Sequence, residues 1–443
     1  MHIDRLQLTN FKCFADRTIE FQPSFNLLVG ENGSGKTTVL EALAVASGAW
    51  LLGLARYSTH CRARSILPAE VRLKAVQEGG TIIRYERQFP VGVMARGAVA
   101  GEEISWMRTL DGANGRTTSS GAAALKRLGE RLGHRAMDGE AVTLPLISYY
   151  GTGRLWQQPR DLKTKRAASV SKARTSVFAG YTNSHDPRAS AADLFRWIQT
   201  QRFIALEEGK DPVALQGHRK AVLGCIEGGR NLNFSVKLAD LIIDIEGQGR
   251  LPFNNLSDGY RNMIAMVGDI AFKALTLNPH LGLNAAAETP GVVLIDELDL
   301  HLHPKWQRRV IDDLKRTFPA IQFICTTHSP FLIQSLQPGE LIPLHENAAD
   351  LDYSGRPIEN IIEDIQGVKV PQRSRRAEEA DHAAEAYFSL LRQKPAVDPK
   401  ELAQAELKYR NISSTYSDNS ALDAILKLEA LAVVREGGGH ETR

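Results

Sequence analysis

The sequence predicts an α/β fold built on a mixed β-sheet, and three short apolar runs carry this prediction. Each run is short and strongly apolar, as expected for a strand buried on both faces. The runs are Phe25–Val29, Gly291–Asp296 and Ile321–Cys325. After the first run, Val39, Leu40 and Leu43 recur at the spacing of a helix that buries one face. Strands that alternate with helices are typical of α/β folds.

A glycine-rich loop separates the first strand from its helix. Residues Gly30–Thr37 spell G-x-x-x-x-G-K-T, the P-loop pattern. Glycines let several backbone N–H groups turn toward one anion, and the helix start adds partial positive charge. Lys36 is expected to contact the β- and γ-phosphates of ATP, and Thr37 to hold Mg²⁺. The expected nucleotide-binding residues are Asn32, Gly33, Ser34, Gly35, Lys36, Thr37 and Thr38.

The composition is that of an ordinary globular protein, with 43% hydrophobic and 24% charged residues. A chain of 443 residues is long enough for more than one lobe. No apolar run approaches the ~20 residues of a membrane helix, and the N-terminus enters a strand pattern without a signal peptide. The cysteines are scattered, which favours a reduced, cytoplasmic protein. A net charge of +3 does not by itself indicate a nucleic-acid partner.

The order of the predicted elements divides the chain into four segments. They are an N-terminal lobe with the P-loop (1–150), a basic loop with an inserted helical lobe (151–250), the rest of the core (251–345) and a C-terminal helical extension (346–443). Gly92–Gly101 is expected to be an exposed loop, and Pro304–Thr317 a single helix. The basic segment Arg154–Arg174 reads as a solvated loop rather than a phosphate- or partner-binding patch.

Two carboxylates close the second apolar run. Asp296 and Glu297 follow four apolar residues, so they stand at the end of a buried strand. Asp296 is expected to hold Mg²⁺ through water, and Glu297 to polarise the attacking water. His328 follows the third run, where its side chain could reach the γ-phosphate. The expected catalytic residues are therefore Lys36, Glu297 and His328, and the expected metal ligands are Thr37 and Asp296.

A further motif narrows the class of P-loop protein. Leu256–Arg261 spells LSDGYR and resembles the LSGGQ signature of an ABC-type ATPase head. This resemblance implies that two copies sandwich two nucleotides, each signature contacting the γ-phosphate on the opposite P-loop. It assigns Ser257, Asp258 and Gly259 to that contact, and Asp299 to the D-loop. This chain has Asp258 where LSGGQ has a glycine, and Tyr260 where it has glutamine. The same differences occur in SMC-like and RecF-like heads, so they argue against a transporter subunit.

The resemblance extends over residues 1–345. YYGTGRLW, FNNLSDGYRNM, VLIDELDLHLHPKWQRRV and FICTTHSPFLI resemble bacterial ATP-binding proteins that include ATPase subunits of Septu-type and retron-linked anti-phage systems. Membership implies an ATPase that assembles with itself and often with an HNH-type nuclease. No nuclease motif and no long heptad arm is seen in this chain, so a nuclease would be another polypeptide.

Three functions follow as hypotheses. The leading one is an ATP-hydrolysing switch that controls a bound effector in anti-phage defence. The alternatives are a DNA-repair or DNA-end-binding ATPase, and a nucleotide-gated scaffold with little turnover. Two weaker site assignments remain. Gln157 and Gln158 are candidates for a Q-loop, whereas His301 and His303 lack the third ligand that a metal site needs.

Overall fold

The computed structural model describes residues 1–78, 81–154, 176–186, 192–344, 353, 355–368, 370–372, 374–392 and 398–413. These residues form two compact units, Met1–Ile361 and Ile362–Arg443. The first unit contains all the sequence-predicted site residues that the structure describes. The candidates Gln157 and Gln158 lie outside the described residues.

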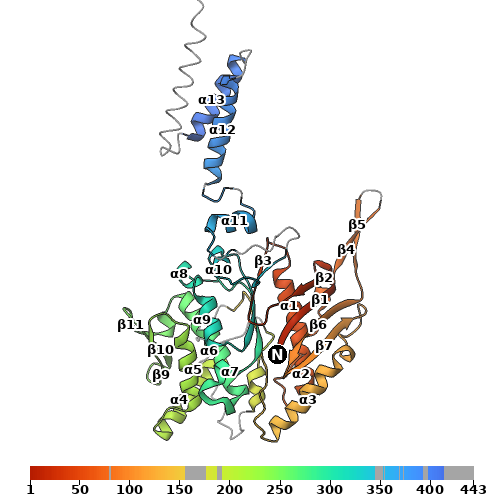
Figure 1. Cartoon of the computed structure of the whole chain (residues 1–443), viewed down its shortest axis with the longest axis vertical. Helices are drawn as coiled ribbons and strands as arrows, with labels where there is room; N and C mark the ends of the chain where they lie inside the picture. Colours follow the sequence, from red (N-terminus) through yellow and green to blue (C-terminus); the bar gives the residue numbers. More distant parts are fainter. Residues whose placement is uncertain are drawn as a thin grey trace, which may run out of the picture. The chain divides into compact units, whose positions relative to one another are not determined.

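A five-stranded parallel sheet lies at the centre of the first unit (Figure 1). Its order is β14-β3-β13-β12-β8, and each neighbouring pair is parallel. The strands are β3 (Phe25–Val29), β8 (Leu146–Tyr150), β12 (Gly291–Ile295), β13 (Ile321–Thr326) and β14 (Leu341–Pro343). Every residue of β3, β8, β12 and β13 is buried. The predicted α/β fold is confirmed, and all three apolar runs are strands of this sheet, which is parallel throughout and not mixed as predicted.

Helix α1 (Lys36–Ser47) joins the parallel sheet to a second, antiparallel one. It contacts β8, β12 and β13 on one side and β1, β6 and β7 on the other. With its continuation it forms the segment Lys36–Leu54, the one described stretch whose length and apolar composition would suit a membrane span. Its most apolar window is 83% buried within the fold. The segment is therefore a core helix of this unit.

The antiparallel sheet has the order β2-β1-β6-β7. Its strands are β1 (His2–Phe11), β2 (Phe14–Glu20), β6 (Val91–Val99) and β7 (Glu102–Leu110), and β4 (Leu73–Glu78) pairs with β5 (Thr81–Arg87) as a separate ribbon. The exposed loop predicted at Gly92–Gly101 is wrong, because β6 occupies most of it. The glycines that suggested a loop have a different purpose, as Gly97 shows. A Cβ at Gly97 would lie 2.1 Å from the carbonyl oxygen of His2 on β1. Its glycine therefore permits close strand pairing.

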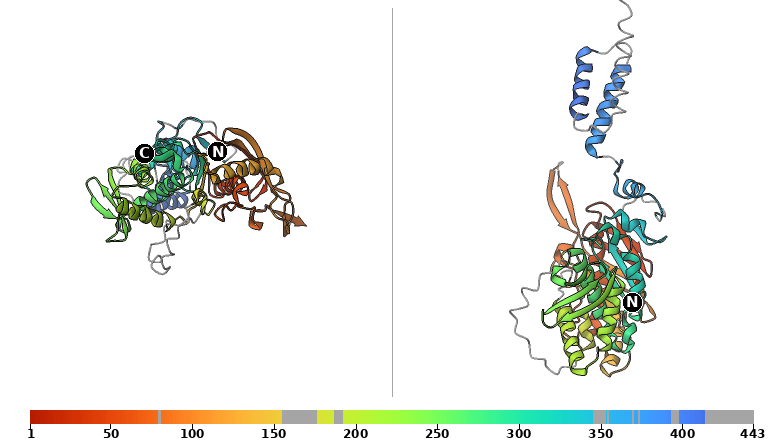
Figure 2. Two further views of the ribbon diagram at one scale, coloured as in Figure 1. Left: turned by 90° about the horizontal axis from the view of Figure 1, so that it is seen from below. Right: turned by 90° about the vertical axis from the view of Figure 1, so that its left-hand side faces the viewer.

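A lobe is inserted between β8 and helix α6 (Asp258–Leu277). It contains α4 (Ala192–Glu208), α5 (Val213–Gly224), β9 (Gly229–Ser235), β10 (Asp240–Ile245) and β11 (Gly249–Pro252). Figures 1 and 2 show this lobe and the antiparallel sheet on opposite sides of the parallel sheet. Helix α6 packs against α5 within the lobe and against β8 of the parallel sheet, so it links the two.

Short helices follow α6 in the described part of the first unit, and one sequence prediction fails among them. They are α7 (Ala285–Glu288), α8 (Pro304–Gln307), α9 (Val310–Thr317) and α10 (Pro330–Gln334). The single helix predicted at Pro304–Thr317 is wrong, because the chain leaves the helical conformation at Arg309, with φ −125°. The Arg309 guanidinium pairs there with Glu227 and Asp313.

The second unit is helical where it is described. Helix α11 (Ile358–Gln366) spans its boundary, and α12 (Arg375–Arg392) and α13 (Pro399–Ser413) pack as a pair. Tyr387 and Tyr409 stack between these two helices with their ring centroids 6.5 Å apart. The rest of the predicted C-terminal helical extension, residues 414–443, lies outside the described residues.

Candidate nucleotide-binding site

The P-loop leaves β3 at Gly30 and enters α1 at Lys36. Gly35 has a φ of 98°, a left-handed conformation that side-chain-bearing residues rarely adopt. A Cβ at this position would also lie 2.5 Å from the Phe14 ring. Both space and conformation therefore require glycine where the loop passes into the helix.

The Lys36 ammonium is held inside the curve of this loop. It donates to the carbonyl oxygens of Gly30 at 2.8 Å and Glu31 at 3.0 Å. Burial lowers the pKa of Lys36, while the charges of Asp296 and Glu297 act in the opposite direction. The lysine thus lies within electrostatic reach of both carboxylates that follow β12.

The Asp296 carboxylate accepts hydrogen bonds from two hydroxyl groups that lie in different parts of the chain. Thr37 Oγ1 donates to Asp296 Oδ2 at 2.9 Å, and Thr326 Oγ1 donates to Asp296 Oδ1 at 2.6 Å. The carboxylate is 4% exposed. These residues meet because β3, β13 and β12 are adjacent parallel strands, whose carboxyl ends lie at one edge of the sheet.

Glu297 has an unusual backbone conformation for a residue with a side chain. Its φ is +51°, and its N–H donates to Thr326 Oγ1 at 2.7 Å. Its carbonyl oxygen accepts a hydrogen bond from Arg154 Nη2 at 2.6 Å. Left-handed non-glycine residues persist where their surroundings hold them. Thr326 and Arg154 hold Glu297 from its two sides.

Arg154 is the site residue that the sequence pattern did not reveal. It stands at the start of the basic segment predicted to be a solvated loop, yet its side chain is 1% exposed. Its guanidinium donates to the carbonyl oxygens of Gly151, Asp296 and Glu297 and to Asn262 Oδ1. A single arginine after an apolar strand carries no local signal that distinguishes a buried, hydrogen-bonded side chain from an exposed one.

His328 and Asp299 lie near the same sheet edge. His328 follows β13, two residues beyond Thr326, and its side chain is exposed. Asp299 accepts a hydrogen bond from Thr327 Oγ1. The structure therefore gathers Lys36, Thr37, Asp296 and Glu297 around the P-loop, with His328 and Asp299 on the segments that follow β13 and β12.

The signature residues occupy a different surface. Ser257 is the exposed N-cap residue of α6, and Asp258 pairs with Arg261 in the first turn. A Cβ at Gly259 would lie 2.6 Å from the His301 carbonyl oxygen, so glycine allows α6 to approach the segment after β12. This contact places the start of α6 against the chain that leads away from Asp296 and Glu297.

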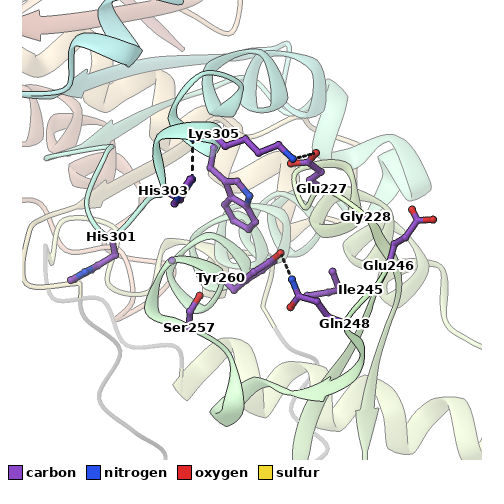
Figure 3. Close-up of a pocket in the computed structure, with 12 residues that line it drawn as sticks. Glu227, Gly228, Ile245, Glu246, Gln248, Ser257, Tyr260, His301, His303 and Lys305 are labelled. Carbon is purple, nitrogen blue, oxygen red and sulfur yellow. Dashed lines mark hydrogen bonds and ion pairs between the residues drawn. The ribbon is translucent and has the colours of Figure 1, made fainter.

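An open cleft of about 490 Å³ lies beside the signature (Figure 3). Ser257, Gly259 and Tyr260 form part of its wall, and no described residue of the P-loop lines it. Tyr260 lies edge-on to Trp306, with the ring centroids 4.4 Å apart, and accepts a hydrogen bond from Gln248. His301 and His303 also line the cleft. Neither belongs to a cluster with metal-ligand geometry among the described residues.

Parts of the chain match two protein-family models and several known proteins. A family model described as "AAA domain" matches residues 5–196, and one described as "AAA domain, putative AbiEii toxin, Type IV TA system" matches residues 146–334. The "Retron Vc95 probable ATPase" of Vibrio cholerae serotype O1 biovar El Tor is 26% identical over 413 residues, covering 80% of this chain and 74% of that protein. "Septu protein PtuA" of Bacillus mycoides (strain KBAB4) is 45% identical over 93 residues, covering 21% of this chain and 12% of that protein.

Among solved structures, an Smc head bound to the C-winged helix domain of ScpA matches with a TM-score of 0.46 and 15% identity. That match covers 77% of this chain and 94% of the other. The two family models together extend from residue 5 to residue 334. Two AAA-domain family models thus match overlapping parts of the chain, which is an ATPase homologous to a retron probable ATPase and to Septu protein PtuA.

Proposed function

We propose that this protein is an ABC-type head that hydrolyses ATP, closes on a second copy of itself around the nucleotide and thereby controls a bound effector. The observation that carries the proposal is the group formed by Lys36, Thr37, Asp296 and Glu297 at one edge of the parallel sheet. It combines a phosphate-binding loop with two carboxylates, as ATP hydrolysis requires.

The same group suits Mg²⁺. The Thr37 hydroxyl and the Asp296 carboxylate supply hard oxygen donors, and they already lie 2.9 Å apart beside the P-loop. These two residues would hold the ion, which neutralises negative charge on the phosphates when bound. Thr326 keeps the Asp296 carboxylate turned toward Thr37 through its own hydrogen bond.

The remaining residues divide the chemistry between binding and water activation. Lys36 would exchange the carbonyl oxygens of Gly30 and Glu31 for the β- and γ-phosphates. Glu297 would accept a proton from the attacking water. His328, an exposed residue in the segment after β13, would reach the γ-phosphate.

The position of the signature supports a two-copy site. Ser257, the N-cap residue of helix α6, is exposed, and together with Gly259 it lines a cleft that no described P-loop residue shares. A helix start is suited to an anion. In a two-fold pair, Ser257, Asp258 and Gly259 of one copy would contact the γ-phosphate on the other copy's P-loop, with Asp299 beside it.

The effector that we propose is a nuclease of the HNH type acting in anti-phage defence in the cytoplasm. The likeness to a retron probable ATPase and to Septu protein PtuA supports this assignment. Nucleic acid enters the same proposal as the substrate of that nuclease.

The test measures molecular mass by light scattering with a slowly hydrolysed ATP analogue and with ADP. We expect the analogue, but not ADP, to double the mass of the wild type and to leave Ser257→Arg monomeric. Ser374→Arg is the matched control, because Ser374 is an exposed serine of the second unit. An unchanged mass of the wild type with the analogue would overturn the two-copy proposal.

A further inference from the structure

Arg154 connects the residues that follow strand β12 to helix α6, which begins with the signature. We propose that it is a positioning residue that fixes the backbone of Glu297 and ties that backbone to the position of α6. This inference rests on the proposed function, because it takes Glu297 as the residue that activates water. It assigns a role in hydrolysis to a residue that acts through its hydrogen bonds to protein atoms.

The first step is that the guanidinium is buried and hydrogen-bonded. Arg154 is 1% exposed, and it donates to three backbone carbonyl oxygens and one side-chain oxygen. Burial lowers its pKa, but an arginine stays charged at neutral pH. A buried cation with this many acceptors holds its neighbours rigidly, because moving one of them would leave a donor unpaired.

The second step concerns two consecutive peptide groups. Arg154 Nη1 donates to the Asp296 carbonyl oxygen, and Nη2 donates to the Glu297 carbonyl oxygen at 2.6 Å. These two bonds set the orientation of the peptide planes on both sides of the Glu297 Cα atom. They therefore hold the left-handed φ of +51° and, with it, the direction of the Glu297 side chain.

The third step leads to the signature helix. Arg154 Nε donates to Asn262 Oδ1 at 3.3 Å, and Asn262 Nδ2 donates to the Leu300 carbonyl oxygen at 3.0 Å. Asn262 is 3% exposed and lies in α6, five positions after Ser257. A displacement of α6 would therefore reach the Glu297 backbone through one asparagine and one arginine.

The test compares Arg154→Lys with Arg108→Lys. Arg108 is also buried, 2% exposed, and donates to the Thr118 carbonyl oxygen at 2.7 Å, yet it lies in β7 of the antiparallel sheet. Lysine keeps the charge but cannot bond both carbonyl oxygens of Asp296 and Glu297 with a planar fork. We expect Arg154→Lys to lower kcat by about 10- to 100-fold with KM for ATP unchanged. Arg108→Lys should leave both constants near wild type.

A double-mutant cycle separates positioning from general structural damage. If Arg154 acts through Glu297, then Arg154→Lys should not slow hydrolysis further in a Glu297→Gln background. Asn262→Ala provides a second variant that keeps the arginine, and it should lower kcat by a smaller factor. Thermal unfolding of each variant shows whether the chain is folded.

The outcomes are distinguishable. Three outcomes would each refute the positioning role. One is a kcat of the double variant that falls by the product of the two single losses. The others are a raised KM with unchanged kcat in Arg154→Lys, and equal effects of Arg154→Lys and Arg108→Lys. Should Arg154→Lys fail to fold, an unchanged kcat in Asn262→Ala would refute it. A Glu297→Gln protein that hydrolyses ATP at the wild-type rate would instead overturn the proposed base, whatever Arg154 does.

Discussion

The Thr37 hydroxyl lies 2.9 Å from the Asp296 carboxylate, although 259 positions separate the two residues along the chain. Thr37 belongs to the first turn of α1, and Asp296 directly follows β12. Between β3 and β12 in the sheet lies β13, whose Thr326 bonds the other oxygen of the same carboxylate. Helix α1, strand β13 and the residue after β12 thus contribute to one side of the candidate nucleotide site, and each contribution can be changed separately.

Lys36→Ala should reduce ATP hydrolysis by a factor of ~10² or more and weaken ATP binding, because it removes the cation expected on the β- and γ-phosphates. Steady-state phosphate release and equilibrium nucleotide binding measure the two effects. Lys74→Ala, at an exposed position of the β4–β5 ribbon, is the control. Near-normal activity of Lys36→Ala would contradict the P-loop assignment.

Glu297→Gln should retain ATP binding but slow hydrolysis by a factor of ~10²–10⁴, because the amide keeps the shape of the side chain without its basicity. The pair of copies formed with ATP should then persist far longer than in the wild type, as size-exclusion chromatography would show. Glu288→Gln, an exposed change in α7, is the control. Continued hydrolysis together with an unchanged elution profile would exclude Glu297 as the base.

Ser257→Arg should leave ATP binding by a single copy nearly intact and still abolish hydrolysis, since the long side chain blocks the approach of the second head. Mixing this variant with Lys36→Ala gives pairs in which one composite site carries both changes and the other carries neither. If the two sites act independently, phosphate release from the mixture should exceed that of either variant alone. Normal hydrolysis by Ser257→Arg would rule out the composite site.

Thr326→Val should disturb both carboxylates, because the Thr326 hydroxyl donates to Asp296 and accepts the N–H of Glu297. Valine leaves that partly buried N–H unpaired, which should lower the free energy of unfolding by about 1–3 kcal/mol and reduce kcat. Thr326→Ser keeps the hydroxyl and serves as the control. Chemical denaturation and phosphate release measure the two effects, and equal behaviour of the valine and serine variants would show that the hydroxyl is not needed.

His218→Gln should reduce the sensitivity of stability to acid. Burial lowers the pKa of His218 to about 4, so the unfolded chain binds a proton more readily than the folded one as pH falls below 6.5. The free energy of unfolding of the wild type should therefore decrease between pH 7 and pH 5, and the glutamine variant should lose less. His382→Gln changes an exposed histidine and should follow the wild type. Parallel pH profiles for all three proteins would contradict the prediction.

The sequence by itself determined the features whose signals are local. The P-loop was recognisable because strand, glycine loop and helix occupy adjacent positions, Phe25–Val29 leading through Gly30 into Lys36–Ser47. The carboxylates Asp296 and Glu297 were recognisable because they end a fully buried strand. Predictions failed where composition imitated another structure, as in β6, whose glycines allow close pairing rather than a loop.

Only the tertiary structure decided which of these segments meet. Parallel pairing of β3, β13 and β12 brings Thr37, Asp296 and Thr326 to one sheet edge, and no local pattern specifies that order of strands. The burial of Arg154 likewise depends on the ends of β8 and β12 and on α6, which supply its four acceptors. Hydrogen bonds between distant residues are fixed by the packing of whole strands and helices, and the residue types alone do not encode that packing.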